Sequence, residues 1–347
     1  MAVNLLTYSG IITKTKALSA KLLSDSDYNN ISEIQTVNDF IIYLRNSQSY
    51  KNIYREHDEV SNRTHVESFL YNSLYNDFAK LYKFSNCNQK QALDILFIKY
   101  ECEYISYCLK NALFGKNEFN ISTPNSFIIQ HSRLNQAELM NAHNINEFVM
   151  AFKGSEYYHL FNVLKNTSHE TLRDYLVPLN IYMYKKIWKS INKLKNKKDK
   201  QVLMDYFGTE IDCKNIMWIY RSKKFFKLSK NDIYVSIIPI HYKIDKNDFI
   251  DMIEAEGVEE LLNIVKKTSY FKNKATVFDS DFNESLIIDI LSDVLADNVR
   301  KYPVSVSLLL SYFHNKRLEI VRLQTALECI KYQLSPPDVL KNIYESV

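Results

Sequence analysis

One helical pattern occurs three times along this chain at nearly equal spacing, and a fixed period of this kind constrains the whole fold. Each copy carries apolar residues at i, i+3, i+4 and i+7, which is one face of an amphipathic helix, and then a short polar turn. The copies begin at Val37, Ile145 and Val258, and their turns lead to Tyr50, Tyr157 and Tyr270. The period is about 110 residues, which is longer than that of common solenoid repeats.

The segment before each copy also recurs, and it has the features of a helix start. An apolar residue is followed by a short polar residue of the type that accepts hydrogen bonds from the first helical N–H groups. These polar residues are Ser24, Asn135 and Asp245, and an apolar or aromatic side chain follows each of them at the same offset. We expect them to be the N-caps of three equivalent short helices.

A long helix with an acidic residue at an equivalent position closes each repeat. The closing segments are 99–115, 208–226 and 315–332, and the acidic residues are Glu101, Asp212 and Glu319. We expect each carboxylate on the exposed or inter-helix side of its helix, with a basic partner inside the protein. A surface pair is worth about 0–1 kcal/mol, so this hypothesis predicts that folding survives each single alanine substitution.

These patterns predict an all-α protein made of three helical-bundle repeats. Alternation of apolar and polar residues is scarce, and Pro239 interrupts the best strand-like run, Tyr234–Ile244. We place the repeats at residues 1–128, 129–240 and 241–347. Three repeats of equal length could close around an axis or stack in an arc, and the pattern leaves both open.

The composition argues against most kinds of catalytic or ligand site. The five glycines are far apart, so the chain has neither a P-loop nor a dinucleotide-binding fingerprint. It has no G-x-S-x-G motif, no pair of histidines at the spacing of a helical metal site, and five scattered cysteines that are interpreted as reduced thiols. We therefore expect no catalytic residue, no cofactor and no metal site.

Charge and hydropathy indicate a soluble protein. A net charge of +4 is too small for the focused basic face of a nucleic-acid-binding domain. No apolar run approaches the roughly 18 residues of a membrane span, and no signal peptide is recognisable, so we expect a cytoplasmic chain. The lysine-rich run 189–200 is interpreted as a solvated helix end, with attraction to acidic lipids or an acidic partner as the alternative.

The order of these motifs resembles one family over the whole chain. The opening has Tyr8, the basic and small residues 14–17, Leu22–Leu23 and Asp27–Tyr28, and the closing has Tyr312–Phe313, Glu319 and Arg322. With the triplication, this is similar to the C subunit of bacterial and archaeal V/A-type rotary ATPases, the counterpart of the d subunit in eukaryotic vacuolar ATPases. That family often has asparagine three residues after the closing acid. Here the position holds Asn215 in one repeat but Tyr104 and Arg322 in the others.

The resemblance implies a funnel-shaped, pseudo-three-fold helical body without chemistry of its own. Such a protein lies on the cytoplasmic face of the membrane rotor ring of proteolipid subunits and receives the central shaft. It is a monomer within a hetero-oligomeric complex that couples ion transport to ATP, with no nucleic acid and no small-molecule substrate. In an alternative placement, the three acidic residues meet basic residues of the shaft.

Two other hypotheses stay open at this point. One is an unrelated helical-repeat scaffold, which would include an RNA-binding protein, although such proteins use many shorter repeats with a readout pair in each. The other is an enzyme without recognisable motifs, for which one repeat should break the pattern with clustered polar groups.

Overall fold

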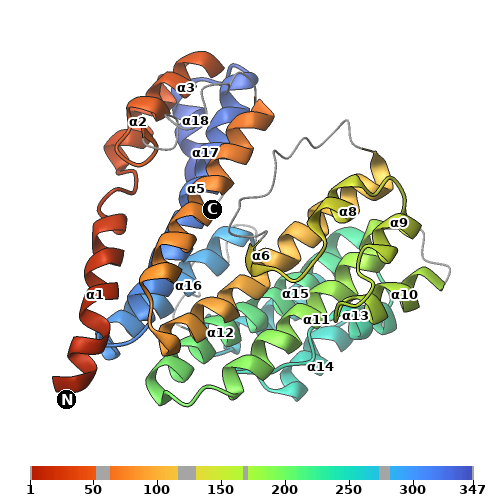
Figure 1. Cartoon of the computed structure of the whole chain (residues 1–347). Coiled ribbons are helices and arrows are strands. Elements are labelled where there is room, and N and C mark those ends of the chain that lie inside the picture. The colour runs from red at the N-terminus through yellow and green to blue at the C-terminus, as the bar shows by residue number, and fades with distance from the viewer. Residues whose placement is uncertain (1, 52–62, 116–129, 167–170, 273–281, 346–347) are drawn as a thin grey trace. The chain divides into compact units, whose positions relative to one another are not determined.

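The computed structural model describes residues 2–51, 63–115, 130–166, 171–272 and 282–345, and every regular element in these ranges is a helix (Figure 1). The predicted all-α class is therefore confirmed for the described residues. The strand-like run Tyr234–Ile244 forms no strand, because its first residues end a helix and the rest is irregular. The predicted boundary between residues 128 and 129 lies outside the described residues.

Packing divides the chain into two compact units. The first unit comprises Met1–Lys90, Tyr104–Tyr158 and Val306–Val347, and the second comprises Gln91–Glu103 and His159–Ser305. This division groups helices by contact, whereas the predicted division into 1–128, 129–240 and 241–347 groups residues by repeated sequence. The three repeats stay a prediction.

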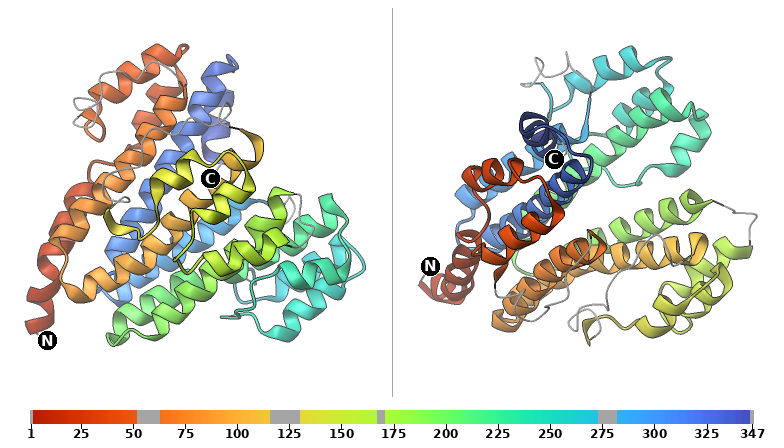
Figure 2. Two further views of the ribbon diagram at one scale, coloured as in Figure 1. Left: turned by 45° about the vertical axis from the view of Figure 1, so that its right-hand side comes forward. Right: turned by 90° about the horizontal axis from the view of Figure 1, so that it is seen from above.

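The first compact unit is built around its long closing helix, α17 (Ser307–Lys331). It also contains α1 (Ala2–Ser19), α2 (Asp25–Ser32), α3 (Val37–Asn46), α5 (Arg63–Phe84), α8 (Gln136–Asn141), α9 (Ile145–Met150) and α18 (Pro336–Glu345). Helices α1, α3, α5 and α18 all contact α17, and Figure 2 shows α1 and α5 lying along it. Helix α6 (Cys87–Phe114) contributes residues to both units.

The second compact unit is built around α12 (Lys197–Arg221), which continues into the π-helical turn η1 (Ser222–Phe226). Its other helices are α10 (Tyr158–Asn166), α11 (Leu172–Asn192), α13 (Lys230–Ser236), α14 (Lys246–Glu254), α15 (Val258–Lys267) and α16 (Glu284–Lys301). Helices α11, α14, α15 and α16 contact α12. Each compact unit thus has a closing helix of one repeat at its centre.

The three predicted N-caps are confirmed, and they explain where the short helices begin. Ser24 and Asp245 form capping boxes at the starts of α2 and α14, each with the acidic residue three positions later. Asn135 accepts a hydrogen bond from the Glu138 N–H at the start of α8. In each case the side-chain oxygen satisfies a backbone donor that has no partner within the helix.

The predicted amphipathic helices α3, α9 and α15 begin at the predicted residues. Their apolar stripes are buried, as Phe40, Phe148 and Leu261 at the equivalent position illustrate, each fully removed from solvent. The tyrosines that follow them are also buried: Tyr50, Tyr157 and Tyr270 are 0%, 1% and 9% exposed. A tyrosine buried to this extent needs a hydrogen-bond partner for its hydroxyl. The partners of Tyr50 and Tyr270 are side chains on the closing helices.

Gly208 allows the side chain of Tyr242 to approach the centre of α12 closely. Its replacement by alanine provides the first test of the fold. A Cβ atom there would lie 2.7 Å from Cδ1 and 2.9 Å from Cβ of Tyr242. Alanine gains up to about 1 kcal/mol of helix propensity, but overpacking costs about 1–3 kcal/mol. We expect G208A to lower the free energy of unfolding by about 1–2 kcal/mol in chemical denaturation. Gly257 has open space around it, so G257A is the control, and equal losses in the two variants would contradict the packing.

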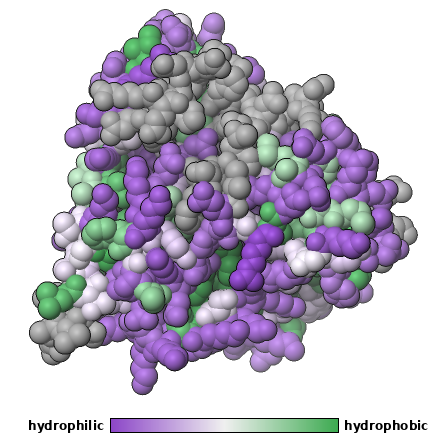
Figure 3. Space-filling model, in the orientation of Figure 1, coloured by the Kyte–Doolittle hydropathy of each residue, from purple (hydrophilic) through white to green (hydrophobic). Residues whose placement is uncertain are grey.

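The described surface is mainly polar, with a few exposed apolar side chains. Figure 3 shows apolar residues beside the N-terminal end of α1 on an otherwise largely hydrophilic face. Leu6 in α1 and Phe84 at the end of α5 are 78% and 56% exposed, and the Phe84 ring approaches α1 at Gly10. Exposed apolar groups of this kind often lie where a protein partner binds. Among the described helices, none combines the length and apolar character needed to cross a membrane.

Candidate functional site

Glu319 lies at the centre of a buried polar cluster in the first compact unit. Its side chain is on α17 and is 3% exposed. Oε2 accepts a hydrogen bond from the backbone N–H of Leu23 at 2.6 Å, and Oε1 accepts one from the Tyr50 hydroxyl at 2.7 Å. The carboxylate therefore ties the residue before α2 and the tyrosine after α3 to the closing helix.

Lys316, one helical turn before Glu319, supplies the positive charge of this cluster. Its ammonium lies 2.7 Å from Glu319 Oε1 and donates to the Tyr50 hydroxyl at 2.9 Å. It also lies 4.1 Å from the centroid of the Tyr50 ring, in cation–π geometry. Burial raises the pKa of Tyr50 well above its ordinary value, and the nearby Glu319 charge adds to the rise. The tyrosine is thus a neutral hydrogen-bond donor.

Asp212 has the equivalent position on α12 in the second compact unit and is fully buried. Its carboxylate accepts hydrogen bonds from three consecutive backbone N–H groups, those of Tyr242, Lys243 and Ile244, at 3.1, 2.8 and 3.3 Å. The Tyr270 hydroxyl donates a fourth, at 2.8 Å. Ile244 precedes the N-cap of α14, as Leu23 precedes that of α2. The two carboxylates therefore make corresponding contacts.

The charge balance differs between the two clusters. No described basic side chain forms an ion pair with Asp212, so its charge faces only hydrogen-bond donors. Burial raises the pKa of Asp212 above its ordinary value, and the hydrogen bonds from Lys243, Tyr270, Tyr242 and Ile244 limit the rise. The ammonium of Lys243 lies over the Tyr270 ring, 5.5 Å from its centroid. The carboxylate of Glu319 is paired with a lysine, whereas that of Asp212 is not.

Glu101 lies on α6, in the part of that helix that belongs to the second compact unit, and is 8% exposed. Its Oε2 atom lies 3.7 Å from Lys186 Nζ of α11. Two residues earlier, Lys99 forms a buried ion pair with Glu210 of α12. Charged groups thus join α6 to both α11 and α12 within this unit.

Burial changes the interpretation of the three predicted acidic residues. None of them is exposed, so of the two expected placements only the inter-helix one agrees with the structure. Glu101 and Glu319 have the expected basic partner, but Asp212 is held by backbone N–H groups and a tyrosine instead. The value of a surface pair does not apply to Glu319 and Asp212, because both are buried and a buried group that loses its partner is costly. Whether folding survives their replacement by alanine stays a prediction.

Apart from Lys316, the partners of Glu319 and Asp212 belong to other predicted repeats. Asp212 of the second predicted repeat meets residues of the third, and Glu319 of the third meets residues of the first. Equivalent elements are joined in both cases: the start of a short helix and the tyrosine after an amphipathic helix. In both compact units, the closing helix of one predicted repeat therefore contacts elements of another predicted repeat.

The residue three positions after the closing acid differs between α12 and α17, and so does the segment that it contacts. The Asn215 side chain both donates to the Ile238 carbonyl, at 2.9 Å, and accepts from its N–H, at 2.8 Å. The guanidinium of Arg322, at the corresponding place on α17, lies over the rings of both Tyr28 and Tyr344, 5.4 and 5.2 Å from their centroids. Asparagine thus holds the segment after α13, whereas arginine holds the C-terminal helix α18.

These clusters hold helices and their flanking segments together through buried hydrogen bonds and ion pairs. Within the described ranges, no group of three or more histidine, cysteine, aspartate or glutamate side chains could hold a metal ion. The residue that sequence reasoning missed is Lys316, which is 2% exposed. The available signal was a lysine one turn before the closing acid, on the same helix face.

Comparison with known proteins gives a consistent result over nearly the full chain. A family model described as ATP synthase (C/AC39) subunit matches residues 11–342. The C subunit of the A-type ATP synthase of Pyrococcus abyssi is 22% identical over 97% of this chain and 90% of its own length. The proteins of the same name from Methanocaldococcus jannaschii and Methanosarcina mazei are 20% and 23% identical, over 98% and 91% of this chain and 86% and 87% of their own lengths.

Proposed function

Because the chain belongs to the ATP synthase (C/AC39) subunit family, we propose that it is a non-catalytic central-stalk component of an A/V-type ATP synthase. In this role it links the central shaft to the membrane rotor ring and transmits rotation, so that ion transport is coupled to ATP. Its place is on the cytoplasmic side of the membrane, as one copy in a hetero-oligomeric complex. The three repeats form a funnel-shaped body with pseudo-three-fold symmetry around the shaft.

The observation that carries this proposal is the exchange of equivalent contacts between repeats. Glu319 of the third repeat binds Tyr50 of the first, 269 positions away, as Asp212 of the second binds Tyr270 of the third. If the three repeats were stacked in an arc, the closing helix of the third repeat would lie far from the first repeat and could not contact it. A closed arrangement suits a protein that lies on the common axis of a ring and a shaft.

The proposed role requires a body that resists twisting. Each elementary charge that crosses the membrane supplies about 2.3 kcal/mol per 100 mV, and the coupling protein carries this load between two partners. Buried hydrogen bonds such as Tyr50–Glu319 and Tyr270–Asp212 hold the segments that they connect more specifically than apolar packing alone. Contacts that persist under load should each bury more than about 1,000 Å² of total surface. The exposed apolar side chains of Leu6 and Phe84 provide one candidate area.

The alternative hypotheses receive less support. An RNA-binding scaffold would need a basic or aromatic readout surface repeated along the chain, whereas the polar groups that recur here are buried between helices. An enzyme would need a reactive group in a cleft, and the two carboxylate clusters are saturated with internal hydrogen bonds. Neither hypothesis explains the match to the family over residues 11–342.

Deletion of the chain from its cells tests the coupling role. We expect membranes and catalytic heads from the deletion strain to hydrolyse ATP while ATP-driven ion transport is lost, because rotation of the head no longer reaches the ring. ATP hydrolysis is measured by phosphate release, and transport by the quenching of a gradient-sensitive dye in membrane vesicles.

Complementation with the wild-type chain is the control and should restore ion transport. The isolated chain should hydrolyse no ATP. Ion transport that continues in the deletion strain at the wild-type ratio to hydrolysis would refute the coupling role and favour a general scaffold.

A further inference from the structure

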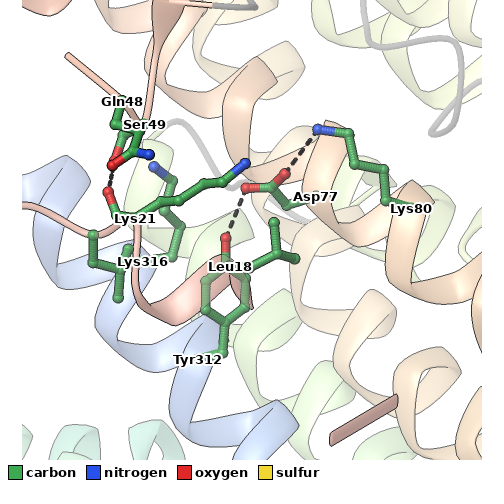
Figure 4. Close-up of a pocket in the computed structure, with 9 residues that line it drawn as sticks. Leu18, Lys21, Gln48, Ser49, Asp77, Lys80, Tyr312 and Lys316 are labelled. Carbon is green, nitrogen blue, oxygen red and sulfur yellow. Dashed lines mark hydrogen bonds and ion pairs between the residues drawn. The ribbon is translucent and has the colours of Figure 1, made fainter. Parts of the chain in front are cut away.

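A small cavity, lined by several polar side chains and two leucines, lies in the first compact unit beside the Glu319 cluster (Figure 4). Its wall combines the end of α1, the turn after α3, and the helices α5 and α17. The lining residues are Leu18, Lys21, Leu22, Gln48, Ser49, Asp77, Lys80, Tyr312 and Lys316. The volume is about 40 Å³, and one water needs roughly 10–15 Å³ on this measure. The cavity is therefore large enough for a compact polar ligand.

Three lysines from separate elements line this cavity. Lys21 follows α1, Lys80 is on α5 and Lys316 is on α17, and Figure 4 shows the Lys80 ammonium pointing to the Asp77 carboxylate. The neighbouring carboxylates are those of Asp77 and Glu319. Three lysines against two carboxylates leave an excess of one positive charge, so the cavity favours an anion.

The carboxylates are occupied, and the ammonium groups keep donors available. Asp77 accepts hydrogen bonds from the Tyr312 hydroxyl at 2.7 Å and from Lys80 at 3.1 Å. Lys316, which is 2% exposed, uses two of its three N–H donors on Tyr50 and Glu319. No described side chain forms a hydrogen bond or ion pair with the Lys21 ammonium. The cavity is thus lined by one buried lysine and two exposed lysines.

We propose that this cavity binds a small oxyanion of the phosphate class. Charge-assisted hydrogen bonds from ammonium groups are the strong bonds that hold such ions, and lysine is a common phosphate ligand. A tetrahedral oxyanion presents several acceptor oxygens, so it can accept from more than one of the lysines that line the cavity. The bound ion would connect α1, α5 and α17 close to the point where the Glu319 carboxylate already connects α17 to the start of α2. The site is independent of the proposed coupling function.

Titration calorimetry of the full chain with inorganic phosphate at low ionic strength provides the test. We expect saturable binding of one phosphate, competition by sulfate, and no displacement by chloride at matched ionic strength. The double variant K21Q/K80Q should weaken binding by about tenfold or more, because it removes the two exposed charged donors that line the cavity. Both side chains are exposed, so the variant should fold normally.

The matched control is K14Q/K83Q, which removes the same charge from exposed positions on α1 and α5 that do not line the cavity. It should bind phosphate as the wild type does. Lysine acylation followed by mass spectrometry gives a second readout, in which phosphate should protect Lys21 and Lys80 but not Lys14 and Lys83. A phosphomonoester that binds as tightly as phosphate would identify a phosphorylated compound as an equally good ligand of the same site. The absence of saturable binding, or equal weakening by both double variants, would overturn the proposal.

Discussion

Replacing Glu319 with alanine is expected to lower the free energy of unfolding of the first compact unit by about 3–5 kcal/mol, the usual cost of removing one partner from a buried ion pair. The loss has three sources within one site. The Lys316 ammonium keeps its charge in the core without a carboxylate, and the Leu23 N–H and the Tyr50 hydroxyl lose their acceptor. Y50F should cost less, about 1–3 kcal/mol, because it removes the two hydrogen bonds of the Tyr50 hydroxyl, to Glu319 and from Lys316, but leaves the ion pair intact.

Chemical denaturation measures the loss, and hydrogen exchange locates it. The Leu23 amide should exchange faster in E319A, since this N–H donates to Glu319. The control is E345A, which removes a glutamate from an exposed pair with Lys341, at 3.9 Å. Such a pair contributes about 0–1 kcal/mol. In K316M/E319M no charge is left unpaired, so this variant should recover part of the stability lost in E319A. A loss of stability in E319A no larger than that in E345A would show that the Glu319 cluster does not stabilise the first compact unit.

The local features of this fold could be predicted because they depend on residues close in sequence. The N-caps Ser24, Asn135 and Asp245 were recognisable, since a capping side chain acts on backbone groups two or three residues ahead. The starts of the amphipathic helices followed from the spacing of apolar residues, which sets one buried face. These signals are contained in windows of about ten residues.

The pairing of Glu319 with Tyr50 could not be predicted in the same way. Periodicity shows that Glu319, Asp212 and Glu101 are equivalent, but equivalence does not tell which repeat supplies the partner. The partner of Glu319 is 269 positions away and that of Asp212 is 58 positions away, although the contacts are of the same type. Acidic residues are usually exposed, so burial of the three carboxylates also ran against the ordinary expectation for charged side chains.

Replacing Asp212 with asparagine is expected to destabilise the second compact unit by about 1–3 kcal/mol, the cost of leaving a buried donor unsatisfied. The carboxylate presents acceptors to four donors, whereas an asparagine presents one acceptor oxygen and an NH₂ group. If the amide oxygen keeps the hydrogen bonds from Lys243, Ile244 and Tyr270, the NH₂ group meets the Tyr242 N–H. D212A should cost more, because it removes the acceptor for all four donors.

The control is D297N on α16, where the aspartate is exposed and forms ion pairs with Arg300 and Lys301. This change should have a small effect, since exposed pairs contribute about 0–1 kcal/mol. Hydrogen exchange of the amides of residues 242–244 should accelerate in D212N and stay unchanged in D297N. Unchanged exchange at residues 242–244 in D212N would contradict the hydrogen bonds assigned to Asp212.

The pH dependence of stability, compared between the wild type and D212N, separates the effect of Asp212 ionisation from the effect of the packing around it. Burial raises the pKa of Asp212 in the folded state, while an aspartate in an unfolded chain titrates near about 3.9. The folded state therefore binds the proton more tightly, and the stability from this linkage is fully present below the unfolded pKa. It is lost as the pH rises from about 4 through the folded pKa, because the folded state must then bury a charge that no lysine balances. Asparagine does not titrate, so the difference in the free energy of unfolding between the wild type and D212N should narrow as the pH rises through this window. A difference that stays constant would show that the carboxylate keeps its ordinary pKa on folding.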